Sequence, residues 1–233
     1  MICKIQNNDP QSDLLFVFFA GFGSDHKYWC DVQHYFADYN AVFLSENYFN
    51  DPADVAFDDL ADIFKNKTIV GVGHSLGYYK LCALQEQYSF FQMQKIVSVE
   101  GFSSYLGHNC YDRTVREFYL NLMKINYQIA PKQTLSNFIS MCGFFMPALP
   151  ALLNQDQILR DIDLLYKSIA CPKIPHLVLS SFDDWVVPYS IIEDNFRRLK
   201  DVNIIYTFGA GHLLGMRYPK QVSEQILQFT KLK

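Results

Sequence analysis

Short apolar runs recur along the chain and alternate with longer stretches in which apolar positions follow a helical period. The first clear run, Leu14–Phe19, contains no polar residue, which is typical of a strand buried on both faces of a sheet. Further strands are predicted over 41–44, 68–73, 95–99, 176–180 and 203–208. Helices are predicted over 28–39, 53–65, 76–88, 189–199 and 219–232. This alternation predicts an α/β fold with a mostly parallel central sheet flanked by helices.

One segment, at about 107–171, interrupts the alternation because it shows no strand pattern. Its helical patterns cover 113–126, 134–145 and 156–168. We interpret the segment as a helical lid inserted into a core formed by 1–106 and 172–233. The alternative is a set of ordinary covering helices. A length of 233 residues suits one domain overall.

The composition excludes several classes to which this protein could belong. Half of the residues are hydrophobic and 19% are charged, which excludes intrinsic disorder. A net charge of -4 argues against nucleic-acid binding. The start of the chain has no leader pattern, and no apolar run is long enough to span a membrane. The six cysteines are scattered without a C-x-x-C pair, so we expect reduced thiols in a cytoplasmic protein. We also expect a monomer.

The strongest motif is G-x-S-x-G, formed by Gly73, Ser75 and Gly77 between a predicted strand and a predicted helix. A serine in such a strained turn projects its hydroxyl into a cleft, and small neighbours let the backbone pack closely. Ser75 is therefore the predicted nucleophile. The alternative is a chance match in a glycine-containing turn.

A serine hydroxyl needs a base to take its proton, and the base needs an acid to orient it. His212 follows the last predicted strand, in the loop position where sites of open α/β sheets lie. Asp183 and Asp184 follow the preceding strand. The spacing Asp-x-x-Val-Pro favours Asp184 as the acid, and Asp183 is expected to cap the loop.

An oxyanion hole requires two backbone amides near the serine. The amide of Leu76 opens the helix after Ser75, and the amide of Phe22 lies between Gly21 and Gly23, after the first long strand. The alternative for this turn is an ordinary strand-to-helix connection. No cluster with metal-ligand spacing and no phosphate-binding glycine loop is present in the sequence, so we expect no metal and no cofactor.

The predicted lid is rich in apolar residues, which either pack onto the core or line an acyl tunnel. These residues are Phe138, Ile139, Met141, Phe144, Phe145, Met146 and Leu149.

Taken together, these motifs resemble the α/β-hydrolase superfamily over roughly residues 14–229. The lid start at 111–118 and the stretch 152–163 are similar to the BioH-type pimeloyl-[acyl-carrier protein] methyl ester carboxylesterases. Two positions depart from that family. Ala20 stands where the family has a histidine, and Glu117 stands where it has a second arginine, with Arg116 one place earlier.

The resemblance implies a serine carboxylesterase that hydrolyses a pimeloyl-[acyl-carrier protein] methyl ester in biotin synthesis, with acyl carrier protein as the partner that presents the acyl ester. It implies that Arg113 and Arg116 contact the carrier. It also implies that a set of residues binds the substrate: Phe22, Leu76, Phe118, Tyr119, Leu120, Asn121 and Leu122.

Other functions stay open. The triad does not distinguish an esterase from a thioesterase, a lipase-like acyl hydrolase or a carbon–carbon bond lyase of the same fold. A catalytically silent binding module is a further alternative from a different class of protein.

Overall fold

The computed structural model describes residues 1–107, 110–143, 149–150 and 152–231. A seven-stranded sheet in the order β1-β3-β2-β4-β5-β6-β7 forms its centre. β1 pairs antiparallel with β3, and every other neighbouring pair is parallel. The strands are β1 (Ile2–Gln6), β2 (Leu14–Phe19), β3 (Asn40–Ser45), β4 (Thr68–His74), β5 (Met93–Val99), β6 (His176–Ser181) and β7 (Val202–Thr207).

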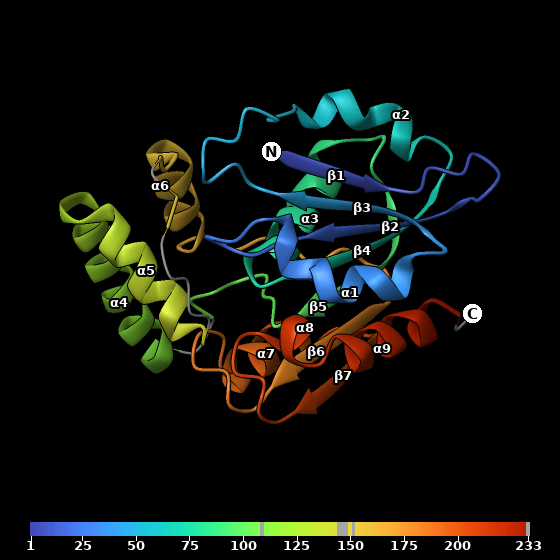
Figure 1. Ribbon diagram of the computed structural model, residues 1–233. Coiled ribbons are helices and arrows are strands. Elements are labelled where there is room, and N and C mark those ends of the chain that lie inside the picture. Colours follow the sequence, from blue (N-terminus) through green and yellow to red (C-terminus); the bar gives the residue numbers. More distant parts are fainter. Residues whose placement is uncertain (108–109, 144–148, 151, 232–233) are drawn as a thin grey trace.

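Helices cover both faces of the sheet, with α1, α8 and α9 in front of it in Figure 1 and α3 behind it. The helices are α1 (Cys30–Gln33), α2 (Ala61–Phe64), α3 (Leu76–Gln87), α4 (Cys110–Ile129), α5 (Pro131–Met141), α6 (Gln155–Leu164), α7 (Tyr189–Phe196), α8 (Leu214–Arg217) and α9 (Pro219–Lys231). Short 3-10 helices cover His26–Trp29, His34–Phe36 and Phe57–Leu60.

The predicted α/β fold with a mostly parallel sheet is confirmed. β2 has the predicted bounds, and its residues Leu15–Phe19 are at most 2% exposed, as a strand covered on both faces requires. Three local predictions were incomplete. The helix expected over 53–65 begins only at Phe57, as a 3-10 helix followed by the short α2. β1 was not expected, because this edge strand mixes apolar and polar residues and most of it is not buried. The helix expected over 28–39 is a succession of short 3-10 and α-helical turns that ends at Phe36.

Helices α4, α5 and α6 lie between β5 and β6 in the chain and gather at one end of the sheet, at the left of Figure 1. None of the described residues between 107 and 167 lies in a strand, as expected for this insertion. Three of the apolar residues predicted for the lid, Phe144, Phe145 and Met146, lie outside the described residues.

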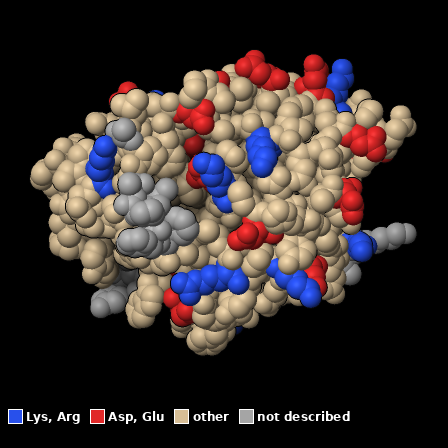
Figure 2. Space-filling view, in the orientation of Figure 1, with Lys and Arg blue, Asp and Glu red and all other residues tan. Residues whose placement is uncertain are grey.

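The surface has no single dominant charge on the face drawn in Figure 2, where acidic and basic side chains are interspersed. Among the described helices, none is long and apolar enough to cross a membrane. Five cysteines have described side chains, and all five are free thiols: Cys3, Cys30, Cys82, Cys142 and Cys171.

Candidate active site

Ser75 stands between the end of β4 and the start of α3, with φ 52° and ψ -123°. Close packing explains its glycine neighbours. A Cβ on Gly73 would lie 2.4 Å from the backbone of Tyr78, and a Cβ on Gly77 would lie 2.2 Å from the carbonyl oxygen of Phe19. Both flanking positions therefore require glycine, and the turn places Ser75 at the carboxyl end of β4, where it lines a cavity.

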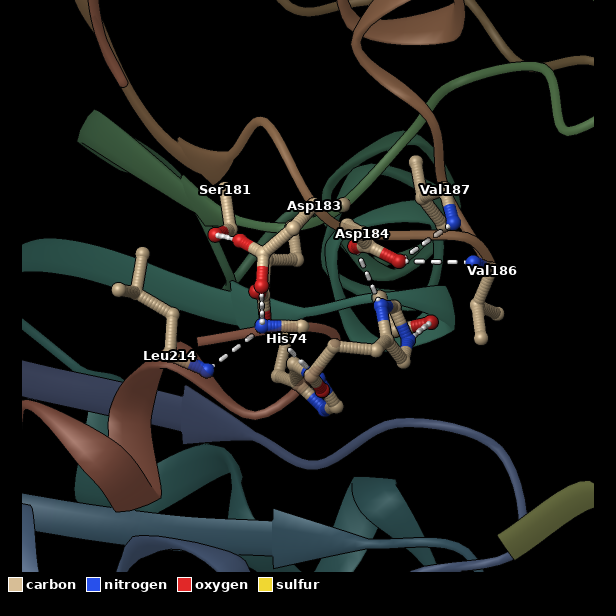
Figure 3. A network of polar contacts seen from close by, with 12 residues as sticks. His74, Ser181, Asp183, Asp184, Val186, Val187 and Leu214 are labelled. Carbon is tan, nitrogen blue, oxygen red and sulfur yellow. Dashed lines mark hydrogen bonds and ion pairs between the residues drawn. The ribbon is translucent and has the colours of Figure 1, made fainter. Parts of the chain in front are cut away.

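The three residues of the predicted triad lie in one hydrogen-bonded row. His212 Nε2 is 3.0 Å from Ser75 Oγ, and His212 Nδ1 is 2.7 Å from Asp184 Oδ2. Asp184 Oδ1 also accepts hydrogen bonds from the amides of Val186 and Val187, at 2.8 and 2.9 Å (Figure 3). Because His212 Nδ1–H donates its hydrogen bond to Asp184, Nε2 is left as the acceptor that faces the serine hydroxyl.

The neighbouring Asp183 has a different set of contacts. Its carboxylate accepts hydrogen bonds from the amides of Gly209 (2.9 Å) and Gly211 (3.2 Å) and from the Ser181 hydroxyl. These bonds tie the loop that carries His212 to the end of β6. Asp184 contacts the histidine ring, whereas Asp183 contacts the backbone on which that histidine is mounted.

The loop after β2 packs directly against the serine turn. A Cβ on Gly21 would lie 3.0 Å from Ser75 Cβ and 2.7 Å from His74 Nδ1, so this position also excludes a side chain. The approach brings the backbone around Phe22 beside the nucleophile. Leu76 is the first residue of α3, so its amide has no acceptor within the helix. Both candidate oxyanion donors thus border Ser75.

A second buried acid–histidine pair, Glu100 and His74, lies behind the triad and was not predicted. Glu100 Oε2 accepts from the Leu214 amide at 3.0 Å and lies 3.6 Å from His74 Nε2, which is 3.3 Å from the carbonyl oxygen of His212. Burial raises the pKa of Glu100 well above its ordinary value, and the nearby Asp184 adds to this effect. Burial lowers the pKa of His74 well below its ordinary value, and His212 adds to this effect. Through these contacts with Leu214 and His212, the pair stabilises the loop that carries His212.

His74, Glu100 and His212 also form a group of potential metal ligands, with candidate ligand atoms within 4.8 Å of one another. The sequence carried no metal signal because the three residues come from different strand ends. In the described geometry, hydrogen bonds to Ser75 and Asp184 use both ring nitrogens of His212.

A largely apolar cavity of ≈ 220 Å³ opens at Ser75. It is lined by Phe22, Gly23, Ser24, Asp25, Lys27, Tyr28, Phe49, His74, Ser75, Phe138, Ile139, Cys142, His212, Leu213 and Met216. The core, the loop after β2 and helix α5 all contribute, and Phe138 packs edge-on against Phe22 with ring centroids 5.3 Å apart.

The structure brings only part of the predicted substrate set to this cavity. Phe22 lines it, whereas Leu76 lies beside it at the start of α3. The five expected α4 residues, Phe118, Tyr119, Leu120, Asn121 and Leu122, are not among the described lining residues. Successive helix residues point about 100° apart. Phe118 and Tyr119 accordingly face outward, 59% and 64% exposed, while Leu120 points into the protein.

The two lid arginines make local contacts in this structure. Arg113 Nη1 is 3.5 Å from the carbonyl oxygen of Gly107, and Arg116 Nη2 is 3.4 Å from the hydroxyl of Ser190 on α7. Neither arginine lines the cavity at Ser75.

Solved structures share this architecture over nearly the whole chain. MenH from S. aureus is 16% identical and covers 99% of this chain and 98% of its own, with a TM-score of 0.70. An esterase (EaEST) from Exiguobacterium antarcticum is 11% identical, with coverages of 99% and 95% and a TM-score of 0.77. The enol-lactonase from Burkholderia xenovorans LB400 is 9% identical, with coverages of 99% and 96% and a TM-score of 0.75.

The chain has the α/β-hydrolase fold. At these identities the likeness concerns the fold, and proteins of different named activities share it. No protein-family model matches the sequence, and no curated protein is significantly similar to it. The fold alone therefore does not identify the reaction of this chain, which depends on the residues of its site.

Proposed function

We propose that the chain is a serine carboxylesterase in which Ser75, His212 and Asp184 form the catalytic triad. The observation that carries the proposal is the continuous row from Ser75 Oγ to His212 Nε2 (3.0 Å) and from His212 Nδ1 to Asp184 (2.7 Å), placed at the opening of an apolar cavity. This order of contacts suits proton removal from the hydroxyl.

In the first half of the reaction, Ser75 Oγ attacks the ester carbonyl carbon while its proton passes to His212 Nε2. The carbonyl oxygen becomes an oxyanion, which the amides of Phe22 and Leu76 stabilise. Collapse of this intermediate breaks the ester C–O bond, and His212 gives its proton to the departing alkoxide. In the second half, water gives a proton to His212 and attacks the acyl-enzyme. The acid is then released and Ser75 regains its proton.

The test is labelling by a fluorescent fluorophosphonate, together with p-nitrophenyl acetate hydrolysis. Wild type should be labelled and active, and Ser75→Ala should lose both properties. Ser223→Ala is the control, because Ser223 is a buried serine of α9 whose hydroxyl bonds to the Pro219 carbonyl oxygen. Labelling of Ser75→Ala at the wild-type rate would refute Ser75 as the nucleophile.

The narrower substrate that the sequence resemblance implies is a pimeloyl-[acyl-carrier protein] methyl ester, hydrolysed to methanol and the free ω-carboxyl. An apolar cavity at the nucleophile suits an alkyl chain, and this supports the proposal. The α4 positions 118–122 give it no support, because they lie outside that cavity. Release of methanol from this substrate, compared with a free pimeloyl methyl ester, tests whether the carrier matters.

The alternatives predict other outcomes of the same assays. A clear preference for acyl-CoA thioesters over p-nitrophenyl esters would favour a thioesterase. Absence of labelling in folded wild type would favour a silent binding module.

A further inference from the structure

A buried polar network connects helix α6 to the rest of the protein. Lys80 Nζ of α3 donates to Asp161 Oδ1 at 2.6 Å and to Glu46 Oε1 at 2.7 Å. The hydroxyl of Tyr48 donates to Asp161 Oδ2 at 2.5 Å. Asp161 and Tyr48 are each 1% exposed. Buried ionic groups need every partner in place, so this network fixes α6 against α3 and the loop after β3.

Tyr48 has a second connection to the start of α6. Its carbonyl oxygen accepts from the amide of Asn154 at 2.8 Å, and Asn154 caps the helix by accepting from the Gln157 amide at 3.1 Å. Both the side chain and the main chain of Tyr48 are therefore bound to this one helix of the insertion.

On its other side, Tyr48 meets the loop that carries the proposed oxyanion donor. Its ring packs edge-on against Phe22, with centroids 5.6 Å apart. Burial raises the pKa of the Tyr48 hydroxyl, whereas the Gly23 amide, which lies near that hydroxyl, lowers the pKa slightly. Gly23 has φ +69°, and a Cβ there would lie 2.9 Å from Leu135 of α5. Phe22 thus lies between two constrained glycines, Gly21 against the serine turn and Gly23 against Leu135, with the Tyr48 ring against its own.

We propose that Tyr48, held by Asp161 of α6, is a positioning residue that sets the orientation of the Phe22 amide in the oxyanion hole. The inference rests on the proposed esterase function. It couples helix α6 to the chemistry, because α6 supplies the carboxylate that orients the Tyr48 hydroxyl. A donor held in place before the reaction stabilises the transition state without reorganisation, so the effect belongs mainly to kcat.

The test compares two buried Tyr→Phe substitutions. Tyr48→Phe removes the hydroxyl of the network. Tyr127→Phe is the matched control, because Tyr127 of α4 is also 1% exposed and its hydroxyl has no hydrogen-bond partner among the described residues. The readouts are kcat and KM for p-nitrophenyl acetate, the rate of fluorophosphonate labelling, and Tm.

Loss of a whole oxyanion donor lowers kcat by about 10²–10³-fold, so a misaligned donor should cost about tenfold. We expect Tyr48→Phe to lower kcat and the labelling rate by about tenfold with KM within about twofold of wild type. Tyr127→Phe should leave all three within about twofold.

A second pair of variants lies on α6. Asp161→Asn removes the charge from the network, and Asp163→Asn changes a more exposed aspartate of the same helix that pairs with Lys124. Only Asp161→Asn should lower kcat, and it should add little to Tyr48→Phe, because two residues that act through one path are not additive.

The outcomes separate the inference from the proposed function. An inactive, unlabelled wild type would refute the esterase itself. An active wild type in which Tyr48→Phe matches Tyr127→Phe would refute the positioning role alone. A lower Tm in Tyr48→Phe with unchanged kcat per folded molecule would assign the hydroxyl to stability and also refute it.

Discussion

Ser75 shows how a single residue can occupy an unfavourable backbone conformation when its surroundings require it. Its φ of 52° is rare for a residue with a side chain, and the close contacts at Gly73 and Gly77 leave no room to relax the turn. The same rigid turn sets the distance from Ser75 Oγ to His212 Nε2. The strained backbone at Ser75 therefore also fixes the position of its hydroxyl relative to His212.

The two adjacent aspartates give a prediction at this scale. Asp184→Asn should lower kcat by about 10³–10⁴-fold, since an amide facing His212 Nδ1 favours the wrong tautomer. Asp183→Asn should keep kcat within about tenfold of wild type, because Asp183 contacts the backbone of the loop and not the ring. Steady-state kinetics with p-nitrophenyl acetate distinguishes the two. A larger loss from Asp183→Asn would exclude Asp184 as the orienting acid.

At the scale of elements, the proposed catalytic and oxyanion residues come from loops at the carboxyl ends of β2, β4, β6 and β7. Carboxylates in loops at this edge of the sheet accept hydrogen bonds from backbone amides of other loops, and these bonds hold the loops in place. Asp183, after β6, binds the amides of Gly209 and Gly211, after β7. Glu100, after β5, binds the amide of Leu214 at the start of α8. Asp183 connects the loops of two neighbouring strands, and Glu100 connects the loop after β5 to the start of α8. These bonds stabilise the site along the edge of the sheet.

The loop contact of Asp183 predicts a pH dependence of stability. Hydrogen bonds from the Ser181 hydroxyl and from the loop amides lower the pKa of Asp183 below its ordinary value near 3.8. A carboxyl with a lowered folded-state pKa stabilises the fold above its unfolded-state pKa, and this contribution is lost as pH falls through the folded-state value. The free energy of unfolding of wild type should therefore exceed that of Asp183→Asn by a constant amount from pH 7 to about pH 5. The difference should shrink below about pH 4.

Urea unfolding of both proteins across this pH range measures the difference directly. A difference that grows as the pH falls would contradict the stabilising role of the carboxylate.

At the scale of the whole molecule, the cavity at Ser75 lies between the insertion and the core. Ile139 and Phe138 come from α5, Phe22 comes from the loop after β2, and Met216 comes from α8. We propose that the insertion acts as a lid and that its helix α5 sets the length of the acyl group.

Filling the cavity from the α5 side should therefore change specificity. Ile139→Trp should raise the ratio of kcat/KM for p-nitrophenyl acetate over p-nitrophenyl hexanoate by about tenfold, because a pocket contact of one or two methylenes is worth about 1–3 kcal/mol. Ile125→Trp is the control on α4, where Ile125 is 53% exposed and outside the cavity lining. Equal ratios in the two variants would mean that the chain of the ester does not enter this cavity.

The fold and the central residues of the site followed from local patterns. Continuous apolar runs such as Leu14–Phe19 indicate buried parallel strands, and the G-x-S-x-G turn fixes its own geometry through steric exclusion at two glycines. Chain order after the last two strands then placed Asp184 and His212 at the same edge of the sheet. Each of these patterns involves residues close together in the chain, so a single sequence is enough to detect it.

Contacts between distant segments were not accessible in this way. Glu100 lies beside His74, and the Tyr48 hydroxyl bonds to Asp161, which is 113 positions away in the chain. Neither contact is predicted by a spacing in the sequence. The α4 residues were assigned to the substrate from family resemblance, yet the rotation of that helix turns Phe118 and Tyr119 outward. Rotation depends on packing against the rest of the molecule.

The sequence by itself determined the α/β class, the strained serine turn and the chain order of the proposed nucleophile, acid and base, because each depends on short-range periodicity or on the steric needs of a few neighbouring residues. Only the tertiary structure decided which side chains enclose the cavity, how Asp183 holds the loop of His212 and how α6 is bound to Tyr48. These depend on directions in space between segments far apart in the chain, and those directions are set when the whole core packs.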